Sequence, residues 1–416
     1  MTEYPTPDAR EATPGVASDA VLDAASAVVL DAAYFRRWLT AAAELFRREG
    51  ARLTALDAAI GDGDHGANMV RGFAAVCEAA EQNPPAAPGD VFGLAGTTLT
   101  NSVGGASGPL FGTALRRTGK RLGAQETVTV AELGAALRAG ALSVGKLGGA
   151  VPGDATLLDA LVPALDALET RASTSVTEAF TAARAAARTG ADATEALQAR
   201  KGRASYLGER SVGHQDAGAN SVVVLFDALL LAADPAWAPE PMATEAQQPT
   251  VDSSEDDAEE PAMEEPAMEE PATEGSTTPK GGGRVGVVLV SHSREVAAST
   301  AELAKAMVGS GDVAPVLAAG GTDDGRIGTS AERIHAAALK ADEGKGVAVL
   351  CDMGSAVLTV QALLSGSDDR VMPADTRIVD APFVEGAVGV VVTASVGADL
   401  DMVVAAGEDA RNYRKR

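Results

Sequence analysis

An acidic, proline-rich segment over residues 235–283 divides this chain into two parts. It holds thirteen acidic side chains against one base, Lys280, and repeats Glu-Glu-Pro-Ala-Met/Thr three times. Such a segment buries too little apolar surface to fold, and its charges and prolines keep it extended. We therefore predict a disordered linker between two separately folded units, and a similar disordered tail over residues 1–18.

The first unit, residues 19–234, has the composition of closely packed helices. Alanine is abundant and aromatic residues make up only 3% of the whole chain. Apolar residues recur at spacings of three and four, which is the helical period. After a first helix that starts near Asp19, further helices are predicted over residues 67–82, 91–100, 107–122, 130–145, 154–169, 173–188, 192–201 and 217–233. No convincing strand is visible, so we predict an all-helical domain.

The second unit, residues 284–416, follows a different pattern. Short apolar, β-branched runs over 285–290, 313–317, 346–350 and 376–379 alternate with helical stretches. This alternation predicts a doubly wound, mostly parallel sheet. Ligands of such sheets bind at the carboxyl ends of the strands. His292, Asp352 and the loop that begins at Gly320 all follow strands and are expected at that edge.

Three carboxylates stand within eight residues of the first unit, at Asp57, Asp62 and Asp64, with glycines between them. Hard oxygen ligands suit Mg²⁺, and glycines let the backbone approach a phosphate. This pattern predicts a Mg²⁺–phosphate loop. A calcium loop would need a glutamate at its twelfth position, which is missing. A solvated Asp-Gly turn remains the alternative.

Four joints between the predicted helices are rich in glycine and small polar residues, over 101–109, 148–156, 202–208 and 213–220. A helix C-cap needs one glycine, not such a cluster. Helix N-termini preceded by glycine bind anions, and Arg203 offers a planar fork for phosphate. The alternative is a set of tight turns in a compact bundle, with Arg203 on a solvated face.

His292 stands where the first predicted strand ends and a helix begins. A neutral imidazole there can accept a phosphoryl group, whose charge would face the N-terminus of the following helix. The alternative is a histidine without a chemical role.

Composition excludes several classes of protein. The hydrophobic share of 46% supplies a core, and a net charge of −24 argues against an electrostatic nucleic-acid surface. Two distant cysteines make a disulfide framework implausible, which favours a reducing cytoplasm. We expect no secretory signal and no membrane span.

The motifs of both units together resemble a known system. Residues 19–234 resemble the ADP-binding L subunit of bacterial dihydroxyacetone kinases. The resemblance rests on Asp57-x4-Asp62-Gly-Asp64-His65-Gly, Gly104-Gly-Ala-Ser-Gly-Pro, Pro152-Gly-Asp-Ala-Thr and Gly202-Arg-Ala-Ser-Tyr-Leu-Gly. Residues 284–412 resemble the M subunit, a phosphohistidine carrier related to mannose-type phosphotransferase system components. The resemblance rests on Val290-Ser-His292-Ser, the Gly320–Ser330 glycine-rich loop, Asp352-Met-Gly-Ser355 and Ala381-Pro-Phe-Val-Glu385-Gly.

The L-type resemblance implies an eight-helix barrel that holds tightly bound ADP or ATP and two Mg²⁺ at one end. It implies metal ligation by Asp57, Asp62 and Asp64. The residues that would line the nucleotide are His65, Gly66, Ala67, Asn68, Ala106, Ser107, Gly148, Leu157, Arg203, Asp216, Ala217 and Gly218. Two positions depart from the family pattern. Leu157 replaces a common methionine, and Asp216-Ala217-Gly218 stands where Asp-Pro-Gly is usual.

The M-type resemblance implies that His292 is phosphorylated by a histidine phosphocarrier protein and that the C-terminal domain forms a homodimer. It also implies a helix over residues 385–394, where propensity alone predicts a strand. No segment resembles the K-type subunit that binds dihydroxyacetone, so that subunit and the phosphocarrier are expected as separate chains. Two alternatives remain: an ATP-exchanging kinase of another small substrate, and a nucleotide-state regulatory module that binds a transcription factor.

Overall fold

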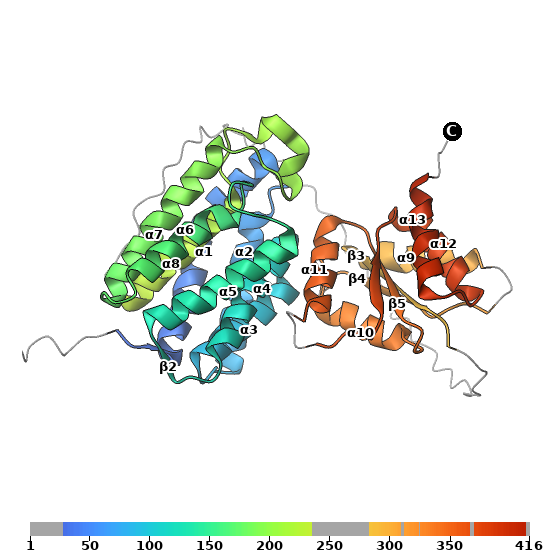
Figure 1. Ribbon diagram of the computed structural model, residues 1–416, viewed down its shortest axis with the longest axis horizontal. Coiled ribbons are helices and arrows are strands. Elements are labelled where there is room, and N and C mark those ends of the chain that lie inside the picture. The colour runs from blue at the N-terminus through green and yellow to red at the C-terminus, as the bar shows by residue number, and fades with distance from the viewer. Residues whose placement is uncertain (1–27, 235–282, 309–311, 324, 367–369, 413–416) are drawn as a thin grey trace, which may run out of the picture.

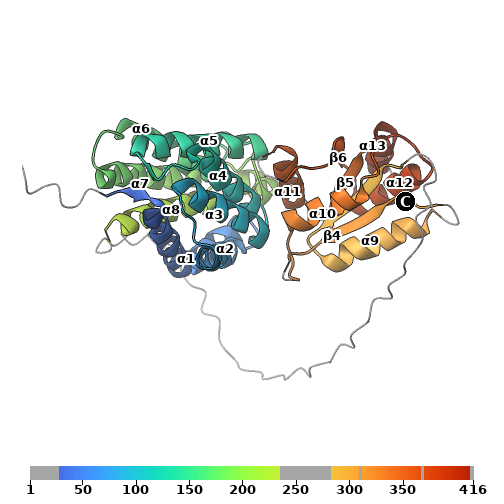
Figure 2. The same cartoon turned by 90° about the horizontal axis from the view of Figure 1, so that it is seen from below.

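The computed structural model describes residues 28–234, 283–308, 312–323, 325–366 and 370–412 (Figure 1). The tail over 1–18, predicted to be disordered, lies outside the described residues, as does the predicted linker up to residue 282. The described residues form a helical unit and a sheet-containing unit, which lie next to each other in both views (Figures 1 and 2).

The helical unit contains long helices that pack in sequence order. Each helix contacts the next, and the last contacts the first. Their bounds are α1 Ala32–Ile60, α2 His65–Gln82, α3 Pro88–Ser102, α4 Ser107–Leu122, α5 Val130–Gly148, α6 Leu157–Thr170, α7 Val176–Ala193 and α8 Ala217–Ala233. Because consecutive helices run in opposite directions (Figure 1), the even-numbered helices all begin at the same end of the unit.

Small residues explain how closely these helices approach. On α3 and α4, a Cβ added to Gly96 would lie 2.6 Å from the carbonyl oxygen of Gly112. A Cβ on Gly119 would lie 2.5 Å from the carbonyl oxygen of Gly89. No side chain fits at such distances, so glycine sets the spacing between the two helices. The low aromatic content is thus matched to close backbone packing.

Capping residues define where several helices begin. Thr129, Thr156 and Ser175 each accept a backbone N–H bond from the first turn, and an acidic residue three positions later bonds back to each of them. Such capping boxes satisfy amides that the helix itself leaves unpaired. The start of α6 at Leu157 is therefore determined locally, three residues after the predicted start.

Three predictions for this unit are wrong in detail. Leu30–Asp31 (β1) pairs with Thr127–Val128 (β2), where no strand was predicted, and Asp31 caps α1, so the helix begins at Ala32. The predicted helix over 192–201 is reduced to a 3₁₀ turn, Thr194–Ala196. Buried Thr194 bonds back to the carbonyl of Ala191 and accepts the N–H of Asp216, which competes with helical continuation. A second 3₁₀ segment spans Arg203–Ser211.

The C-terminal unit contains a four-stranded parallel sheet in the order β4-β3-β5-β6. The strands are β3 Gly286–Ser291, β4 Val316–Gly320, β5 Val347–Cys351 and β6 Thr376–Val379; the helices are α9 Arg294–Ala306, α10 Ala331–Ala341, α11 Gly354–Leu364, α12 Phe383–Ser395 and α13 Leu400–Asp409. A short 3₁₀ turn, Ala410–Asn412, follows α13. The predicted parallel sheet is confirmed, although β4 begins three residues later than predicted.

Alternate residues of β3 are buried in two separate hydrophobic cores, one on each face of the sheet. Val287 and Leu289 pack with the helices α9, α12 and α13, while Val288 and Val290 pack with α10 and α11. This period of two, with both faces buried, explains why the strand reads as one continuous apolar run. The stretch over 385–394 is helical, as the resemblance implied, and its valines contribute to the first of these cores.

The helices α10 and α11 lie between the sheet and the helical unit (Figure 2). The helix α11 contacts α4 and α5, and α10 contacts α3. The opposite face of the sheet carries α9, α12 and α13 (Figure 1). Across the described residues, no helix combines the length and apolarity needed to cross a membrane.

Candidate functional site

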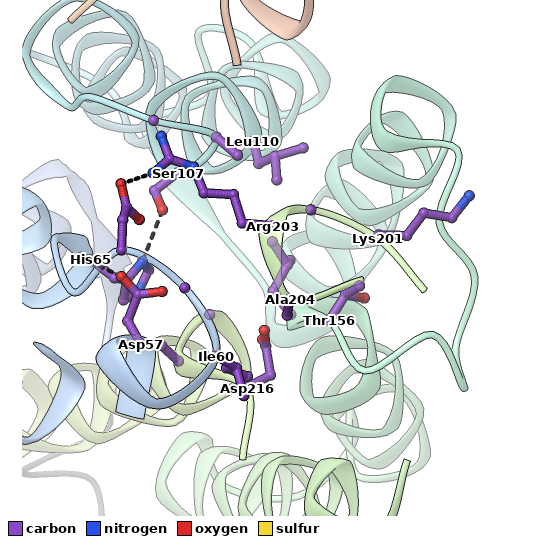
Figure 3. Close-up of a pocket in the computed structure, with 18 of the residues that line it drawn as sticks. Asp57, Ile60, His65, Ser107, Leu110, Thr156, Lys201, Arg203, Ala204 and Asp216 are labelled. Carbon is purple, nitrogen blue, oxygen red and sulfur yellow. Dashed lines mark hydrogen bonds and ion pairs between the residues drawn. The ribbon is translucent and has the colours of Figure 1, made fainter. Parts of the chain in front are cut away.

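Four helix N-termini meet at one pocket of about 180 Å³ in the helical unit. The first residues of α2, α4, α6 and α8 line it, namely His65, Ser107, Leu157 and Ala217. A helix N-terminus carries partial positive charge and unpaired N–H groups, so it attracts anions. Four such ends around one pocket favour a ligand with several negatively charged groups. Figure 3 shows side chains from these segments facing the same space.

Three carboxylates lie at the edge of this pocket. Asp57, Asp62 and Asp64 each offer an oxygen, and these oxygens lie within 4.8 Å of one another. Asp57 is oriented by two amides, because its Oδ2 accepts the N–H groups of Asp64 at 2.9 Å and His65 at 3.1 Å. Three hard oxygens this close fit a Mg²⁺ ion, which takes its remaining ligands from water or phosphate. The predicted cluster is therefore brought together.

Arg203 reaches this cluster from the 3₁₀ segment and forms an ion pair with Asp62. Its side chain is nearly half exposed. In Figure 3, Lys201 extends away from the side where Asp57 and His65 lie. Arg203, unlike Lys201, therefore lies beside the carboxylates. This position is compatible with its predicted contact with phosphate.

His65 is held between two hydroxyl groups. Its Nδ1 lies 2.8 Å from Oγ of Ser107 and its Nε2 lies 2.7 Å from Oγ of Ser221. Burial lowers the pKa of His65, while the charges of Asp57 and Asp64 oppose this shift. The neutral ring therefore donates one hydrogen bond and accepts the other. His65 orients the hydroxyl of Ser107 at the start of α4, which itself lines the pocket.

Asp216 caps the N-terminus of α8 by accepting the N–H of Ala219 at 2.6 Å. Burial, helped by the charges of Asp159 and Asp57, raises the pKa of Asp216 to about 7, although hydrogen bonds from the backbone N–H groups of Ala219 and Gly218 oppose this shift. Leu157 contributes an apolar side chain to the same pocket. The replacement of proline by Ala217 leaves this cap intact.

Most of the nucleotide residues expected from the resemblance lie at the pocket, but four do not. Those that line it are His65, Ala106, Ser107, Leu157, Arg203, Asp216, Ala217 and Gly218. Gly66 packs instead against α1, where a Cβ would lie 2.0 Å from the carbonyl oxygen of Gly50. Asn68 is buried and bonds to Arg71, Ala67 is exposed, and Gly148 lines an adjoining cavity. Their contacts with a nucleotide stay predictions.

Ten further pocket residues were not named one by one from the sequence, although Gly105, Ala155, Thr156, Gly202 and Ala204 lie within the predicted glycine-rich joints. They are Ile60, Gly61, Gly105, Leu110, Phe111, Ala155, Thr156, Lys201, Gly202 and Ala204. Phe111 lies one turn after Ser107 on α4, so helical spacing from the predicted loop contained a signal for it. Ile60, the last residue of α1, and Ala155, in the loop before α6, reach the pocket only because α1 and that loop lie at the same end of the unit.

In the C-terminal unit, His292 lies at the end of β3 and is held by Asp352 from the end of β5. The Nδ1 of His292 lies 2.9 Å from Oδ1 of Asp352, and the backbone N–H of His292 donates to Oδ2 at 2.9 Å. The hydroxyl of Ser291 also donates to Oδ2. Burial alone would raise the pKa of Asp352, but the hydrogen bonds from His292 and Ser291 lower it.

Because an ionised carboxylate only accepts, Nδ1 of His292 carries the ring proton. The other nitrogen, Nε2, is therefore unprotonated, and its lone pair accepts the hydroxyl hydrogen of Ser355 at 2.7 Å. Ser355 is the second residue of α11, so Nε2 points at a helix N-terminus. This arrangement suits a nucleophilic nitrogen that gains a negatively charged group.

The loop after β4 completes this site. The N–H of Gly328 donates to the carbonyl of His292 at 2.9 Å, and the N–H of Gly321 donates to the carbonyl of Ser291 at 3.1 Å. The chain passes from β3 to β4 on one side and then to β5 on the other, so the crevice lies where the strand order reverses. The predicted meeting of His292, Asp352 and the glycine-rich loop is confirmed.

The two sites open on one cavity of about 1100 Å³. The helical unit contributes Asp62, Arg203 and Tyr206 to its wall, and the loop that holds His292 contributes Asp352 and Ser355. The helical pocket and the segment that bonds to His292 therefore face the same space.

Comparison with known proteins gives a family match for each unit. Residues 59–231 match the model of the DAK2 domain, and residues 286–404 match that of the PTS system fructose IIA component. The PEP-dependent dihydroxyacetone kinase ADP-binding subunit DhaL of Escherichia coli is 46% identical over 198 residues, which cover 47% of this chain and 94% of that protein. A DhaL subunit of kinase 1 from Listeria innocua is 42% identical over 195 residues, covering 47% and 93%.

Among solved structures, the dihydroxyacetone kinase from C. freundii in complex with AMP-PNP and Mg²⁺ is 27% identical with a TM-score of 0.38, covering 53% of this chain and 37% of that one. The relatives at the sequence level cover the helical unit, and the second family model covers the unit that carries His292. The chain therefore belongs to the DhaL family of dihydroxyacetone kinase subunits, here joined in one polypeptide to a phosphohistidine carrier domain of the phosphotransferase system IIA type.

Proposed function

We propose that this chain is the phosphoryl relay of a phosphotransferase-system-dependent dihydroxyacetone kinase. Phosphate passes from a histidine phosphocarrier protein to His292, from His292 to ADP held at the helical pocket, and from the resulting ATP to dihydroxyacetone. The cavity shared by the pocket and the His292 loop carries this proposal, because a relay needs its donor and acceptor sites to face each other.

The first step uses Nε2 of His292 as the nucleophile. Its lone pair attacks the phosphorus of the phosphohistidine on the carrier protein, so that one P–N bond forms while another breaks. Asp352 stabilises the positive charge that develops on the ring, because it accepts from Nδ1–H. The N-terminus of α11 and the hydroxyl of Ser355 stabilise the oxygens of the bound phosphoryl group.

In the second step, the phosphoryl group on Nε2 of His292 would pass to a β-phosphate oxygen of ADP, which the helical pocket would hold. The P–N bond breaks and the electron pair returns to Nε2, ready to accept again from Ser355. Phosphoryl transfer depends mainly on positioning and charge neutralisation. The N-termini of α2, α4, α6 and α8 would orient the phosphates, and Arg203 would balance the charge that builds up on the transferred group.

The cofactor set follows from the chemistry of the site. Asp57, Asp62 and Asp64 would hold two Mg²⁺ ions, which neutralise phosphate oxygens when bound. ADP would stay bound between turnovers, at the end of a closed barrel formed by the eight helices α1 to α8. Leu157 would cover the adenine, since leucine and methionine have similar volumes.

The assembly that we propose has several chains. A separate K-type subunit holds dihydroxyacetone, and the C-terminal domain forms a homodimer. The domain limits are residues 19–234 for the ADP-binding domain, 235–283 for the linker and 284–416 for the carrier domain. This arrangement places the donor and the final acceptor on different molecules, while ADP remains on this chain.

The test is His292→Ala in the full chain. We expect the loss of turnover driven by the phosphocarrier protein, with unchanged ADP binding, because the ring lies outside the helical pocket. An ATP-exchanging kinase of another substrate would instead exchange its nucleotide rapidly with free ATP, and His292→Ala would leave its turnover unchanged. A regulatory module would give no kinase turnover with a K-type subunit and would retain a transcription factor as its stable partner. Unchanged turnover in His292→Ala would overturn the relay.

A further inference from the structure

Two buried threonines link the glycine-rich loop after β4 to the first turns of α11. Thr329 is 2% exposed and Thr359 is fully buried. Their hydroxyl oxygens lie 3.1 Å apart, and the hydroxyl of Thr359 donates to the carbonyl of Ser355 at 3.2 Å. We infer that Thr329 and Thr359 are positioning residues, which hold Ser355 and the N-terminus of α11 at the distance from His292 that phosphoryl transfer requires. The inference rests on the proposed relay and adds two residues to its carrier site.

These bonds belong to a hydrogen-bond circuit that begins and ends at His292. The N–H of Gly328 donates to the carbonyl of His292 at 2.9 Å, and Thr329 follows Gly328 in the loop. From Thr329 the circuit passes through Thr359 to the carbonyl of Ser355. The hydroxyl of Ser355 then returns to Nε2 of His292 at 2.7 Å. A movement of α11 relative to the loop would therefore lengthen or break at least one of these bonds.

The direction of the bond between the two threonines follows from the others. A hydroxyl has one hydrogen to donate. Thr359 donates its hydrogen to the carbonyl of Ser355, so the hydrogen between the two hydroxyl oxygens comes from Thr329. Thr359 therefore accepts and donates at once. A valine at either position breaks the circuit and leaves the remaining hydroxyl buried without this bond.

The start of α11 shows why such a link matters. The helices α9 and α10 are capped by Ser293 and Ser330, whose side chains accept backbone N–H groups of the first turn. The N-cap of α11 is Met353, whose side chain has no oxygen to accept such a bond. The amides of this turn thus stay available to an anion, but a turn that begins without a polar cap is held less firmly. The bond from Thr359 to the carbonyl of Ser355 fixes this turn from the core instead.

Phosphorylation of His292 increases the importance of this position. When the P–N bond forms, the lone pair of Nε2 is used, so the hydroxyl of Ser355 must turn from Nε2 to an oxygen of the phosphoryl group. This change needs only a rotation of the side chain, provided that the backbone at Ser355 stays in place. The bond from Thr359 holds the carbonyl of Ser355 and does not involve its side chain. The circuit therefore keeps the N-terminus of α11 beside the ring before and after phosphorylation.

The spacing between the threonines separates positioning from stability. Two hydroxyl oxygens 3.1 Å apart are closer than two methyl carbons, whose best separation is about 3.5–4.0 Å. Valine at both positions removes both hydroxyls, which costs little stability because no hydroxyl is left without its partner. The two methyl groups would still widen the gap between the loop and α11. A displacement of about 1 Å in a reacting site can slow the reaction by about 100-fold.

The test uses Thr329→Val, Thr359→Val and the double variant in the full chain, beside the conservative variants Thr329→Ser and Thr359→Ser. Thr300→Val is the matched control, because Thr300 is a buried threonine on α9, on the other face of the sheet. Ser355→Ala is the reference for a lost hydrogen bond to Nε2. Three quantities are measured: the rate of phosphorylation of His292 by the phosphocarrier protein, the nitrogen-15 NMR signal of Nε2, and the melting temperature.

We expect all three valine variants to accept phosphate at least about tenfold more slowly than the wild type. Their Nε2 signal should move in the same direction as in Ser355→Ala. The double valine variant should melt close to the wild-type temperature and remain slow. The serine variants keep the hydroxyl groups and should behave as the wild type, as should Thr300→Val.

Three results would overturn the inference while leaving the relay in place. One is a double valine variant that regains the wild-type rate together with its stability, because the threonines would then only support folding. The second is an unchanged Nε2 signal in the slow variants. The third is a serine variant as slow as the valine variant at the same position. By contrast, a wild-type chain that accepts no phosphate at His292 would refute the proposed function itself.

Discussion

The Nδ1 of His292 lies 2.9 Å from Oδ1 of Asp352, although 60 residues separate the two in sequence. The same carboxylate accepts the backbone N–H of His292 and the hydroxyl of Ser291. One side chain therefore determines both the position of the loop and the ring nitrogen that carries the proton. This leaves Nε2 as the nitrogen that can take a phosphoryl group.

The substitution Asp352→Asn should slow phosphorylation of His292 by about 10- to 100-fold, because an amide no longer selects the Nδ1–H tautomer. The measurement is the rate of phosphate transfer from the phosphocarrier protein. Glu302→Gln on α9, an exposed carboxylate, is the control and should have no effect. Equal rates in both variants would show that Asp352 has no orienting role.

The same aspartate predicts a pH dependence of stability. Its pKa is lowered in the folded state, so its stabilising contribution is present above the unfolded pKa, about 3.9, and is lost as pH falls through the folded pKa. As the pH is lowered from 6 to 3, the melting temperature should therefore fall more steeply for the wild type than for Asp352→Asn. Parallel curves would contradict this assignment.

Asp62→Asn should release ADP, because the cluster of Asp57, Asp62 and Asp64 loses one of the charges that hold Mg²⁺. The helical unit should then melt at a lower temperature, since a ligand that binds only the folded state adds RT ln(1 + [L]/Kd) to its stability. Nucleotide content after gel filtration checks this directly. Asp166→Asn on α6 is an exposed control. Normal ADP content in Asp62→Asn would show that Asp62 has only a structural role in the turn.

Arg184→Met should destabilise the helical unit by about 3 kcal/mol or more. Arg184 lies 2.7 Å from Asp227, and both side chains are largely buried. Burial raises the pKa of Asp227, and the hydrogen bond and charge of Arg184 oppose this shift. Without Arg184 the carboxylate would stay buried with less compensation. Urea unfolding measures the loss, and the double change Arg184→Met with Asp227→Leu should recover most of it.

Replacement of residues 240–279 by a Gly/Ser stretch of equal length should keep turnover close to normal. These residues lie outside the described part of the chain, and the expectation rests on their composition alone. A flexible tether of this length spans about 35–40 Å and gives an effective concentration of about 1 mM. A cut linker should make turnover depend on protein concentration. An inactive Gly/Ser version with both units folded would show that the acidic repeats make specific contacts.

Much of this architecture could be predicted from short sequence patterns, because the preference of a few neighbouring residues for helix or strand is a local property. The strands after residue 284 were identified from their β-branched runs, and His292 and Asp352 were placed at strand ends for that reason. The helix over 385–394 needed a family resemblance, because its valines favour a strand. The 192–201 region was predicted wrongly, because buried Thr194 bonds to Ala191 and to distant Asp216.

The division into two units and the class of each unit followed from the sequence without the structure. So did the grouping of Asp57, Asp62 and Asp64, because eight residues with intervening glycines leave these carboxylates few ways to separate. Tertiary structure alone decided that His65 lies between Ser107 and Ser221, that Gly66 packs against Gly50, and that Asp62 and Ser355 line one cavity. Those contacts join segments that only helix packing and the docking of two units bring together, and no local spacing encodes them.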